Sequence, residues 1–284
     1  MRLIAFENRE KRELGVAEGE TIVPLATASD DMCQLIATFC AKPDELHGLI
    51  EAARSRTAIL ARSAVRLLAP IVRPGKIIGV GRNYLDHVGE GGLERQEAPR
   101  LFFKPSGSGS GPGDTVRRPA AVTKLDFEGE LVVVVGRTLR MADAAEASRA
   151  IAGFTVGNDL SARELQFDVK PPQTSFAKGM DGFAATGPCI VTVDELGPAP
   201  DLAIQTRVNG ELMQAARTGD LIFPVAECLA YMSRFMTLEP GDLFFSGTPA
   251  GVGVFRDPPR FLQPGDVVEV EIEKIGTLVT RIGG

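Results

Sequence analysis

The chain has 284 residues, enough to bury a sizeable hydrophobic core as one large domain or as one domain with a smaller unit attached. Its formal net charge of −6 argues against a nucleic-acid partner, because no basic surface is available to replace the counterions on phosphate. No apolar run approaches the roughly 20 residues that cross a bilayer, so no membrane partner is expected. The amino-terminal segment reaches charged residues too early for the apolar core of a signal peptide, which predicts a cytoplasmic location.

Residues 1–70 are predicted to form a small α+β domain. Arg2 to Phe6 and Thr21 to Leu25 have the composition of strands around a turn at Glu18 to Glu20. Two helical stretches follow, near residues 29–41 and 44–68, and each stops before a proline.

Short strands separated by glycine and proline dominate residues 71–284, the second predicted domain. Many strands with few helices between them predict a predominantly β, mixed or barrel-like domain rather than a doubly wound sheet. The expected strands are Ile77 to Val80, Leu101 to Lys104, Leu131 to Val135, Phe154 to Asp159, Cys189 to Val193, Ile204 to Val208, Asp242 to Ser246, Val267 to Glu273 and Leu278 to Arg281.

Three acidic residues, Asp126, Glu128 and Glu130, alternate with other residues directly before the apolar run Leu131 to Val135. Side chains on a strand alternate between faces, so the three carboxylates are expected on one face. The valine run indicates a strand buried on both sides, where unpaired negative charge is costly. A hard cation bound through oxygen, such as Mg²⁺, Mn²⁺ or Ca²⁺, would relieve that cost. The same spacing within Val268 to Glu273 alternates strictly with apolar residues and predicts a solvated sheet face instead.

His87 and Glu90 are spaced to meet on one turn of helix, where the carboxylate could orient the imidazole as a general base. The alternative is a histidine on a surface turn, and the flanking glycines would equally suit a mobile lid. The chain's second histidine, His47, lies in the amino-terminal unit away from the acidic cluster and is predicted to be structural.

Asp159 stands at the end of a predicted strand, before the sequence Ser161-Ala162-Arg163-Glu164, which has the pattern of a capping box. Arg163 and Gln166 would share a helical face near Asp159. Taken alone, the same pattern is typical of a capped surface helix with an exposed arginine.

Two further segments are glycine-rich. Lys178 precedes a turn, and Thr248 lies in a loop whose backbone amides could bind an anion. Neither segment matches a phosphate-binding motif, and each by itself predicts only a turn.

Taken in this order, the segments resemble the fumarylacetoacetate hydrolase family. The resemblance spans about residues 75 to 284 and hardly extends into residues 1–70. Two departures are Gly129, where an apolar residue is more usual, and the segment through Pro171-Pro172-Gln173, where substrate selectivity is expected to be set. The matching motifs are Gly81-Arg82-Asn83-Tyr84 with His87 and Glu90, Phe103-Lys104-Pro105, Asp126 to Leu131, Asn158 to Gln166, Lys178 to Asp181, and Glu239 to Asp242 leading into Gly247 to Gly253.

The resemblance implies a mixed β-roll or barrel, a homodimer, and a small-molecule substrate that is a 2,4-dioxo acid or a related 2-oxo acid. It implies Mg²⁺ or Mn²⁺ held by Glu128, Glu130 and Asp159, with Asp126 behind these ligands.

The same resemblance assigns catalytic and binding roles. His87, oriented by Glu90, would activate water. The charged groups of substrate and intermediate would be held by Lys178, Arg163 and Gln166. The substrate would also be bound by Tyr84, Gly247 and Thr248.

The predicted function is metal-dependent hydrolysis of a carbon–carbon bond in an acylpyruvate-type 2,4-dioxo acid, which gives a pyruvate-like acid and a second carboxylic acid. The first alternative is a decarboxylase or isomerase of 2-oxo or unsaturated dioic acids, of the oxaloacetate or 2-hydroxyhepta-2,4-dienedioate type. The second is a metal-stabilised binding protein without turnover. The His87–Glu90 pair favours hydrolysis, because water activation needs a base.

Overall fold

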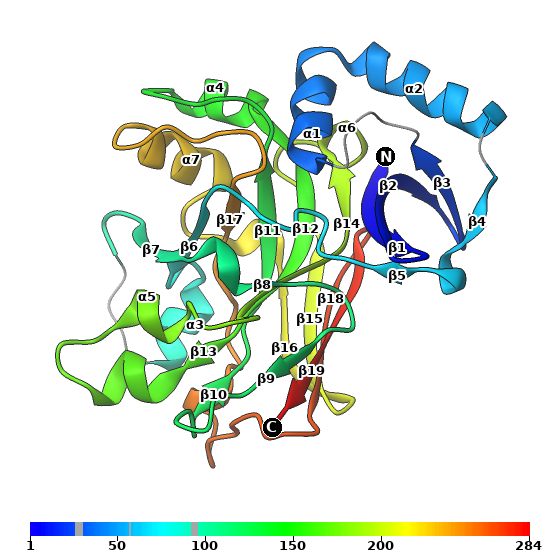
Figure 1. The fold of residues 1–284 in the computed structure, drawn as a ribbon. Coiled ribbons are helices and arrows are strands. Elements are labelled where there is room, and N and C mark those ends of the chain that lie inside the picture. The colour runs from blue at the N-terminus through cyan, green and yellow to red at the C-terminus, as the bar shows by residue number, and fades with distance from the viewer. Residues whose placement is uncertain (26–30, 57, 92–95) are drawn as a thin grey trace.

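The structure, a computed structural model, describes residues 1–25, 31–56, 58–91 and 96–284 (Figure 1). A large mixed sheet runs through the molecule, in the spatial order β4-β3-β2-β1-β14-β12-β11-β17-β6-β7, with β5 beside β1 and β8 beside β14. This order has two ends, so the sheet is open rather than closed as a barrel. The strands are β1 (Arg2–Asn8), β2 (Lys11–Glu18), β3 (Thr21–Leu25), β4 (Leu60–Ala61), β5 (Arg66–Leu67), β6 (Ile77–Gly81), β7 (Arg100–Lys104), β8 (Gly109–Ser110), β11 (Gly129–Val135), β12 (Ile151–Asp159), β14 (Ala184–Thr192) and β17 (Leu243–Phe245).

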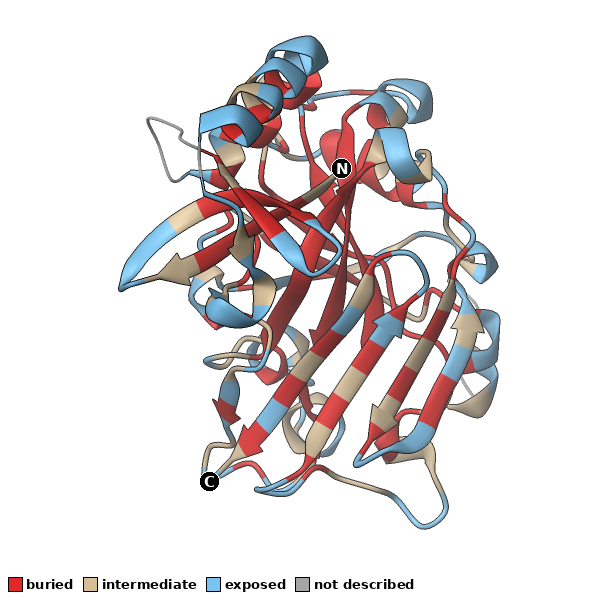
Figure 2. Cartoon of the chain, turned by 90° about the vertical axis from the view of Figure 1, so that its right-hand side faces the viewer, coloured by how far each residue is buried: buried red, intermediate tan, exposed pale blue. Residues whose placement is uncertain are grey.

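A second sheet packs against the first. Its order is β16 (Glu211–Arg217), β15 (Ala203–Val208), β18 (Val267–Ile272), β19 (Gly276–Gly283) and β9 (Thr115–Arg117). Buried residues alternate with more exposed ones along β18 (Figure 2), so the solvated face predicted for its acidic residues is confirmed. A short third ladder joins β10 (Leu125–Asp126) to β13 (Ser161–Ala162).

The central strands of the large sheet are buried on both faces. Every residue of β11, β12 and β14 is buried, as the valine run predicted for β11. Leu131 and Val133 belong to the core shared with the second sheet, whereas Val132 and Val134 belong to the core shared with α1. The acidic residues at the start of β11 are therefore enclosed by packed layers.

Helices and shorter turns cover the sheets and fill the connections. The helices are α1 (Met32–Ala41), α2 (Pro43–Arg56), α3 (Leu85–Glu90), α4 (Ala144–Arg149), α5 (Thr174–Ala177), α6 (Val193–Leu196) and α7 (Val225–Ser233). The shorter turns are η1 (Arg62–Ala64), η2 (Ser106–Ser108), η3 (Glu164–Asp168), η4 (Thr218–Asp220) and η5 (Gly253–Phe255), of which η3 is π-helical. Helix α3 lies in the connection between the paired strands β6 and β7. No helix in the described ranges is both long and apolar enough to cross a membrane.

The amino-terminal segments continue the large sheet. Strand β1 pairs with β14, with Leu3 opposite Ile190. Side chains of α1 and α2 share a core with β11, β12 and β17. Whether residues 1–70 form a domain of their own stays a prediction.

The predicted class, α+β and predominantly β, is confirmed, but some element bounds are wrong. The helix predicted over 44–68 ends at Arg56, and β4, η1 and β5 follow it. Helix propensity favoured the longer helix, but Leu67 instead pairs with Phe6 of β1. Strands β2 and β16 were not predicted, and positions 29 and 30 of the first predicted helix lie outside the described residues.

Candidate metal centre and active site

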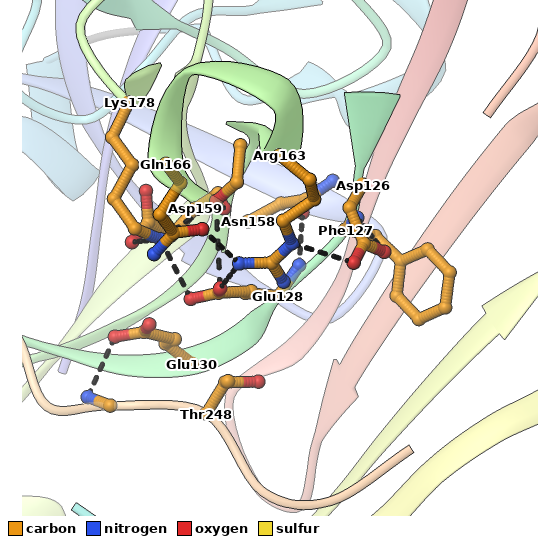
Figure 3. A network of polar contacts seen from close by, with 12 residues as sticks. Asp126, Phe127, Glu128, Glu130, Asn158, Asp159, Arg163, Gln166, Lys178 and Thr248 are labelled. Carbon is orange, nitrogen blue, oxygen red and sulfur yellow. Dashed lines mark hydrogen bonds and ion pairs between the residues drawn. The ribbon is translucent and has the colours of Figure 1, made fainter. Parts of the chain in front are cut away.

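Three buried carboxylates meet where β11 and β12 run antiparallel. Glu130 lies opposite Gly157, and Asp159 ends β12, so the strand register brings the acidic residues together (Figure 3). One oxygen from each of Glu128, Glu130 and Asp159 lies within 4.8 Å of the others. Their exposed fractions are 6%, 1% and 0%. The predicted ligand set is therefore one compact cluster.

Two buried lysines neutralise part of this cluster. Lys178 Nζ donates to Asp159 Oδ2 at 2.7 Å and to Glu128 Oε2 at 2.9 Å. Lys104 Nζ contacts Asp159 Oδ1. Lys104 was matched to a family motif without a role, although a lysine in a strand as apolar as β7 is a signal for a buried charge pair.

Glu130 has no such partner. Its Oε2 accepts a hydrogen bond from the Gly247 amide at 2.7 Å, but no ion pair reaches it within the described residues. Burial, together with the charges of Asp159 and Glu128, raises the pKa of Glu130 well above its usual value. For Glu128, burial acts in the opposite direction to Lys178 and Arg163, and these cations hold its pKa well below its usual range.

The charges of the whole cluster fit a divalent cation. The carboxylates outnumber the buried lysine and arginine cations by one, and all the converging groups offer oxygen, the ligand of hard cations. A divalent ion together with one substrate carboxylate would balance the remaining charge. The carboxylates are those of Asp126, Glu128, Glu130 and Asp159, and the cations are Lys104, Lys178 and Arg163.

Asp126 does not join the other acidic residues. The chain leaves the strand conformation between β10 and β11, so strict alternation does not hold across Phe127 and Glu128. Asp126 instead accepts from the amides of Gly253 at 2.8 Å and Val254 at 3.0 Å. Asp126 therefore lies behind the cluster, as the resemblance implies. The expectation that all three carboxylates share one face of a strand is wrong.

Gly129, the departure from the usual family pattern, is explained by packing. A β-carbon there would lie 2.1 Å from Thr206 Oγ1 of the second sheet. The Gly129 carbonyl also accepts from the Thr248 hydroxyl at 3.0 Å, and Gln214 donates to that hydroxyl at 2.7 Å. Gly129 therefore lets the cluster strand approach the second sheet closely.

Arg163 is buried beside the cluster, so the interpretation as an exposed surface arginine is wrong. Its Nε donates to Asp126 at 2.8 Å and its Nη1 to Gln166 at 2.6 Å, while Nη1 also lies 2.7 Å from Glu128 Oε1. Its Nη2 is buried and has no hydrogen-bond partner among the described residues. Arg163 therefore has one donor available for a ligand.

The predicted capping box at Ser161 is also wrong. Ser161 belongs to β13 and accepts from Lys178 Nζ at 2.7 Å, while Glu164 accepts from the Thr123 amide at 2.5 Å. These tertiary partners replace the local cap that the sequence pattern suggested.

His87 and Glu90 form the predicted pair. His87 Nδ1 lies 2.8 Å from Glu90 Oε1, and Glu90 Oε2 accepts from the Gly251 amide at 2.8 Å. A carboxylate only accepts, so Nδ1 carries the hydrogen and Nε2 of the neutral ring is free to take a proton. The ring is 8% exposed and its centroid lies 5.9 Å from that of Phe255, so His87 does not sit on a surface turn.

A cavity of about 640 Å³ joins these groups. It is lined by residues that the sequence analysis named and by others that it did not. The first group is His87, Glu128, Arg163, Gln166, Lys178 and Thr248, together with Arg82 of a motif that matches the family and with Pro172 and Gln173 of the segment expected to set substrate selectivity. The second group includes Arg100, Phe102, Phe176 and Phe255.

Tyr84 and Gly247 are placed differently from these lining residues. Tyr84 is 2% exposed, and its hydroxyl has no hydrogen-bond partner among the described residues. The Gly247 amide is taken by Glu130. Substrate binding by these two residues stays a prediction.

The chain is similar in sequence to a known protein family and to known enzymes. A family model described as "Fumarylacetoacetate (FAA) hydrolase C-terminal" matches residues 76–283. A mitochondrial oxaloacetate tautomerase of Bos taurus is 41% identical over 224 residues, which cover 79% of this chain and 71% of that protein.

Two solved structures share the fold over the whole chain. The fumarylacetoacetate hydrolase of Exiguobacterium antarcticum is 36% identical with a TM-score of 0.87, and the alignment covers 100% of this chain and 99% of that one. The maleylpyruvate hydrolase of Sphingobium sp. SYK-6, in complex with manganese(II) and pyruvate, is 30% identical with a TM-score of 0.82 and 100% coverage of both chains.

Proposed function

This chain belongs to the fumarylacetoacetate hydrolase family, whose members are enzymes, and on that premise we propose that it hydrolyses a carbon–carbon bond in a 2,4-dioxo acid. The observation that carries the proposal is the His87–Glu90 pair, because His87 lines the same cavity as Glu128 of the three-carboxylate cluster. A base beside a candidate metal site is the combination that activation of water requires.

Glu128, Glu130 and Asp159 would hold the metal, and Mg²⁺ or Mn²⁺ suits their oxygen ligands. When bound, the ion supplies Lewis acidity that stabilises negative charge on a 2-oxo acid. The relative that binds manganese(II) and pyruvate supports this assignment.

His87 would accept a proton at Nε2 from water, while Glu90 holds the ring through Nδ1. The water oxygen bonds to the distal carbonyl carbon of the substrate, and the bond between C3 and C4 breaks. Its electron pair remains on the three-carbon fragment as an enolate. That fragment becomes pyruvate when C3 takes up a proton, which His87 can return.

Other residues of the cavity would position the charged groups. Arg163 can donate through its free Nη2, and Gln166 is held beside it. Lys178 stays charged between Glu128 and Asp159, because these carboxylates raise its pKa against the lowering effect of burial. It therefore places positive charge next to the proposed metal site.

A second candidate is keto–enol conversion of oxaloacetate, favoured by the 41% identity to a relative named for that reaction. It needs no water, because the same base would move a proton between C3 and the enol oxygen. Decarboxylation of oxaloacetate is a third reaction: the bond between C3 and C4 breaks, carbon dioxide leaves, and the electron pair remains on the three-carbon fragment as the enolate of pyruvate, which hydrolysis also gives.

Rates on purified protein with saturating Mg²⁺ distinguish the candidates. The substrates are acetylpyruvate for hydrolysis and oxaloacetate for keto–enol conversion and decarboxylation. If the proposal holds, wild-type protein hydrolyses acetylpyruvate, and His87→Ala lowers that rate about 10²- to 10⁴-fold, the usual effect of losing a positioned base. Decarboxylation should fall much less, because it depends chiefly on the metal.

His47→Ala, at the exposed histidine of α2, is the matched control and should keep wild-type rates. Rapid keto–enol conversion without hydrolysis of any acylpyruvate would replace the first candidate by the second. A homodimer and a cytoplasmic location stay predictions, and the Bos taurus relative is named as mitochondrial.

A further inference from the structure

We propose that Gln214 of β16 is a positioning residue for the active site. It holds the loop from Thr248 to Gly251, here called the Thr248 loop, against the strand that carries the proposed metal ligands. Thr248 lines the cavity, and the backbone amides of its loop are predicted to bind an anion. The inference rests on the proposed function, because it assumes that a 2-oxo acid binds in this cavity. It adds a residue behind the cavity wall that acts through Thr248.

The side-chain amide of Gln214 bonds to the strand and to the loop at once. The residue is 1% exposed, and its Oε1 accepts from the Gly129 amide at 3.0 Å. Its Nε2 donates to the Thr248 hydroxyl at 2.7 Å and to the Pro249 carbonyl at 2.8 Å. The Thr248 hydroxyl in turn donates to the Gly129 carbonyl at 3.0 Å. Gln214 therefore joins the start of the loop to both backbone groups of Gly129.

These partners fix the direction in which the Gln214 amide points. The Gly129 amide can only donate and the Pro249 carbonyl can only accept, so Oε1 must face the strand and Nε2 the loop. An ionised glutamate would offer no donor here, and an apolar side chain would offer neither donor nor acceptor. Because Gly129 separates Glu128 from Glu130, the network places the loop relative to two of the proposed metal ligands.

A β-bulge in the second sheet directs Gln214 toward the loop. In the β15–β16 ladder Thr206 pairs with Gln214. The next pair is Arg207 with Leu212, which leaves Met213 as an extra residue on β16. Met213 and Gln214 are consecutive and both are buried, so the regular alternation of faces is broken at this point. Bulges re-aim side chains and are over-represented next to active sites.

A second contact ties the far end of the Thr248 loop to the same bulge. Arg256 Nη1 donates to the Met213 carbonyl at 3.3 Å and to the Gly251 carbonyl at 3.4 Å. The loop is therefore attached to β16 through Gln214 at its start and through Arg256 at its end. Removal of the Gln214 amide leaves the second attachment in place, so we expect the start of the loop to shift while the loop stays folded.

Separate measurements of metal and ligand affinity test this role. Gln214→Met keeps the length of the side chain and removes its three hydrogen bonds. Calorimetry on the full chain would measure binding of Mn²⁺, and then binding of pyruvate, the ligand of the manganese-containing relative, to the Mn²⁺-loaded protein. We expect pyruvate affinity to fall about 10-fold, the usual effect of weakening a hydrogen bond to a charged group. Manganese affinity should change much less, because Glu128 and Asp159 keep their lysine partners.

Two further variants separate positioning from stability. Gln214→Asn keeps the amide but is one methylene shorter, so it cannot reach the strand and the loop together, and it should also lose pyruvate affinity. It answers the same question if Gln214→Met does not fold. Thr218→Val is the matched control, because the buried Thr218 hydroxyl bonds to the Leu202 amide and the Pro200 carbonyl, outside the set of residues that line the cavity. It should lower the melting temperature and keep both affinities.

Wild-type pyruvate affinity in a folded Gln214 variant would overturn the positioning role and leave the proposed function intact. Equal losses of manganese and pyruvate affinity would overturn it too, because they would show a general disturbance of the site. A similar loss of pyruvate affinity in Thr218→Val would assign the effect to stability and have the same consequence. Absence of pyruvate binding by Mn²⁺-loaded wild-type protein would count against the proposed function, in which pyruvate is a product, and would remove this inference with it.

Discussion

At the scale of single residues, Glu130 is the most informative member of the cluster. The other two carboxylates have lysine partners, whereas among the described residues Glu130 has only the Gly247 amide. A divalent cation would therefore contribute most to the charge balance at Glu130.

Glu130→Gln should abolish metal-dependent activity and the metal-dependent rise in melting temperature, because it removes one charged oxygen ligand. Without metal, the variant should be at least as stable as wild type, since its neutral side chain removes a buried carboxylate with a raised pKa. Calorimetric metal titration and thermal denaturation with and without EDTA measure both effects. Glu271→Gln on the exposed face of β18 is the control. Wild-type metal affinity in Glu130→Gln would refute the ligand assignment.

Part of the acidic cluster could be predicted from the sequence, because carboxylates next to a doubly buried strand have few stable alternatives, and this drew attention to Glu128 and Glu130. The same pattern wrongly included Asp126, and Asp159 was expected beside the two glutamates only from the family resemblance. The partners of Asp126 could not be predicted, since the amides of Gly253 and Val254 lie more than a hundred residues away along the chain. Arg100 and Phe102 were not singled out for a similar reason: their place beside β6 depends on a strand register that no local pattern reveals.

At the scale of elements, Asp126 connects β10 to η5 and to Arg163. It accepts from two η5 amides and from Arg163 Nε at 2.8 Å. Through η5 it also fixes Phe255, whose ring packs beside His87. A single buried carboxylate thus supports both the arginine and the wall of the cavity behind the base.

Asp126→Ala should lower the free energy of unfolding by about 3–5 kcal/mol, the usual cost of leaving the partner of a buried ion pair without its counter-ion. Urea denaturation at neutral pH measures the change. Asp168→Ala breaks the exposed pair with Lys124 and should cost at most about 1 kcal/mol. Similar losses in both variants would show that the buried pair contributes no more than a surface pair.

The elements themselves were predicted unevenly. Strands such as β6, β11 and β15 were found because apolar β-formers bounded by glycine or proline leave little choice. Strand β2 was missed, since its first residues, from Lys11 to Glu13, are charged and its pairing partners lie in β1 and β3. Register and pairing, rather than local composition, decide such segments.

At the scale of the whole molecule, close contact joins the amino-terminal segments to the large sheet. A β-carbon at Gly136 would lie 2.2 Å from Cys40 Sγ of α1 and 2.8 Å from Cβ of Ala152 in β12. Helix α1 can therefore sit on the sheet only because residue 136 has no side chain.

Gly136→Ala should lower the free energy of unfolding by about 1–3 kcal/mol, the usual cost of overpacking, because α1 must move away from the sheet. Metal affinity should stay at the wild-type value if residues 1–70 contribute no catalytic group. Denaturation and metal titration of the same samples measure the two effects. Gly107→Ala, where an added β-carbon meets no atom within 4 Å, is the control. A large loss of metal affinity in folded Gly136→Ala would argue against treating residues 1–70 as a separate unit.

The two oxygens of Glu90 act on different parts of the molecule. Oε1 contacts His87 within α3, and Oε2 holds the Gly251 amide in the loop after β17. One rigid group makes both bonds, so α3 cannot separate from that loop without disturbing the partner that orients the imidazole. This arrangement is an interlock: the base is aligned only when the parts of the active site that come from distant stretches of the chain are already assembled.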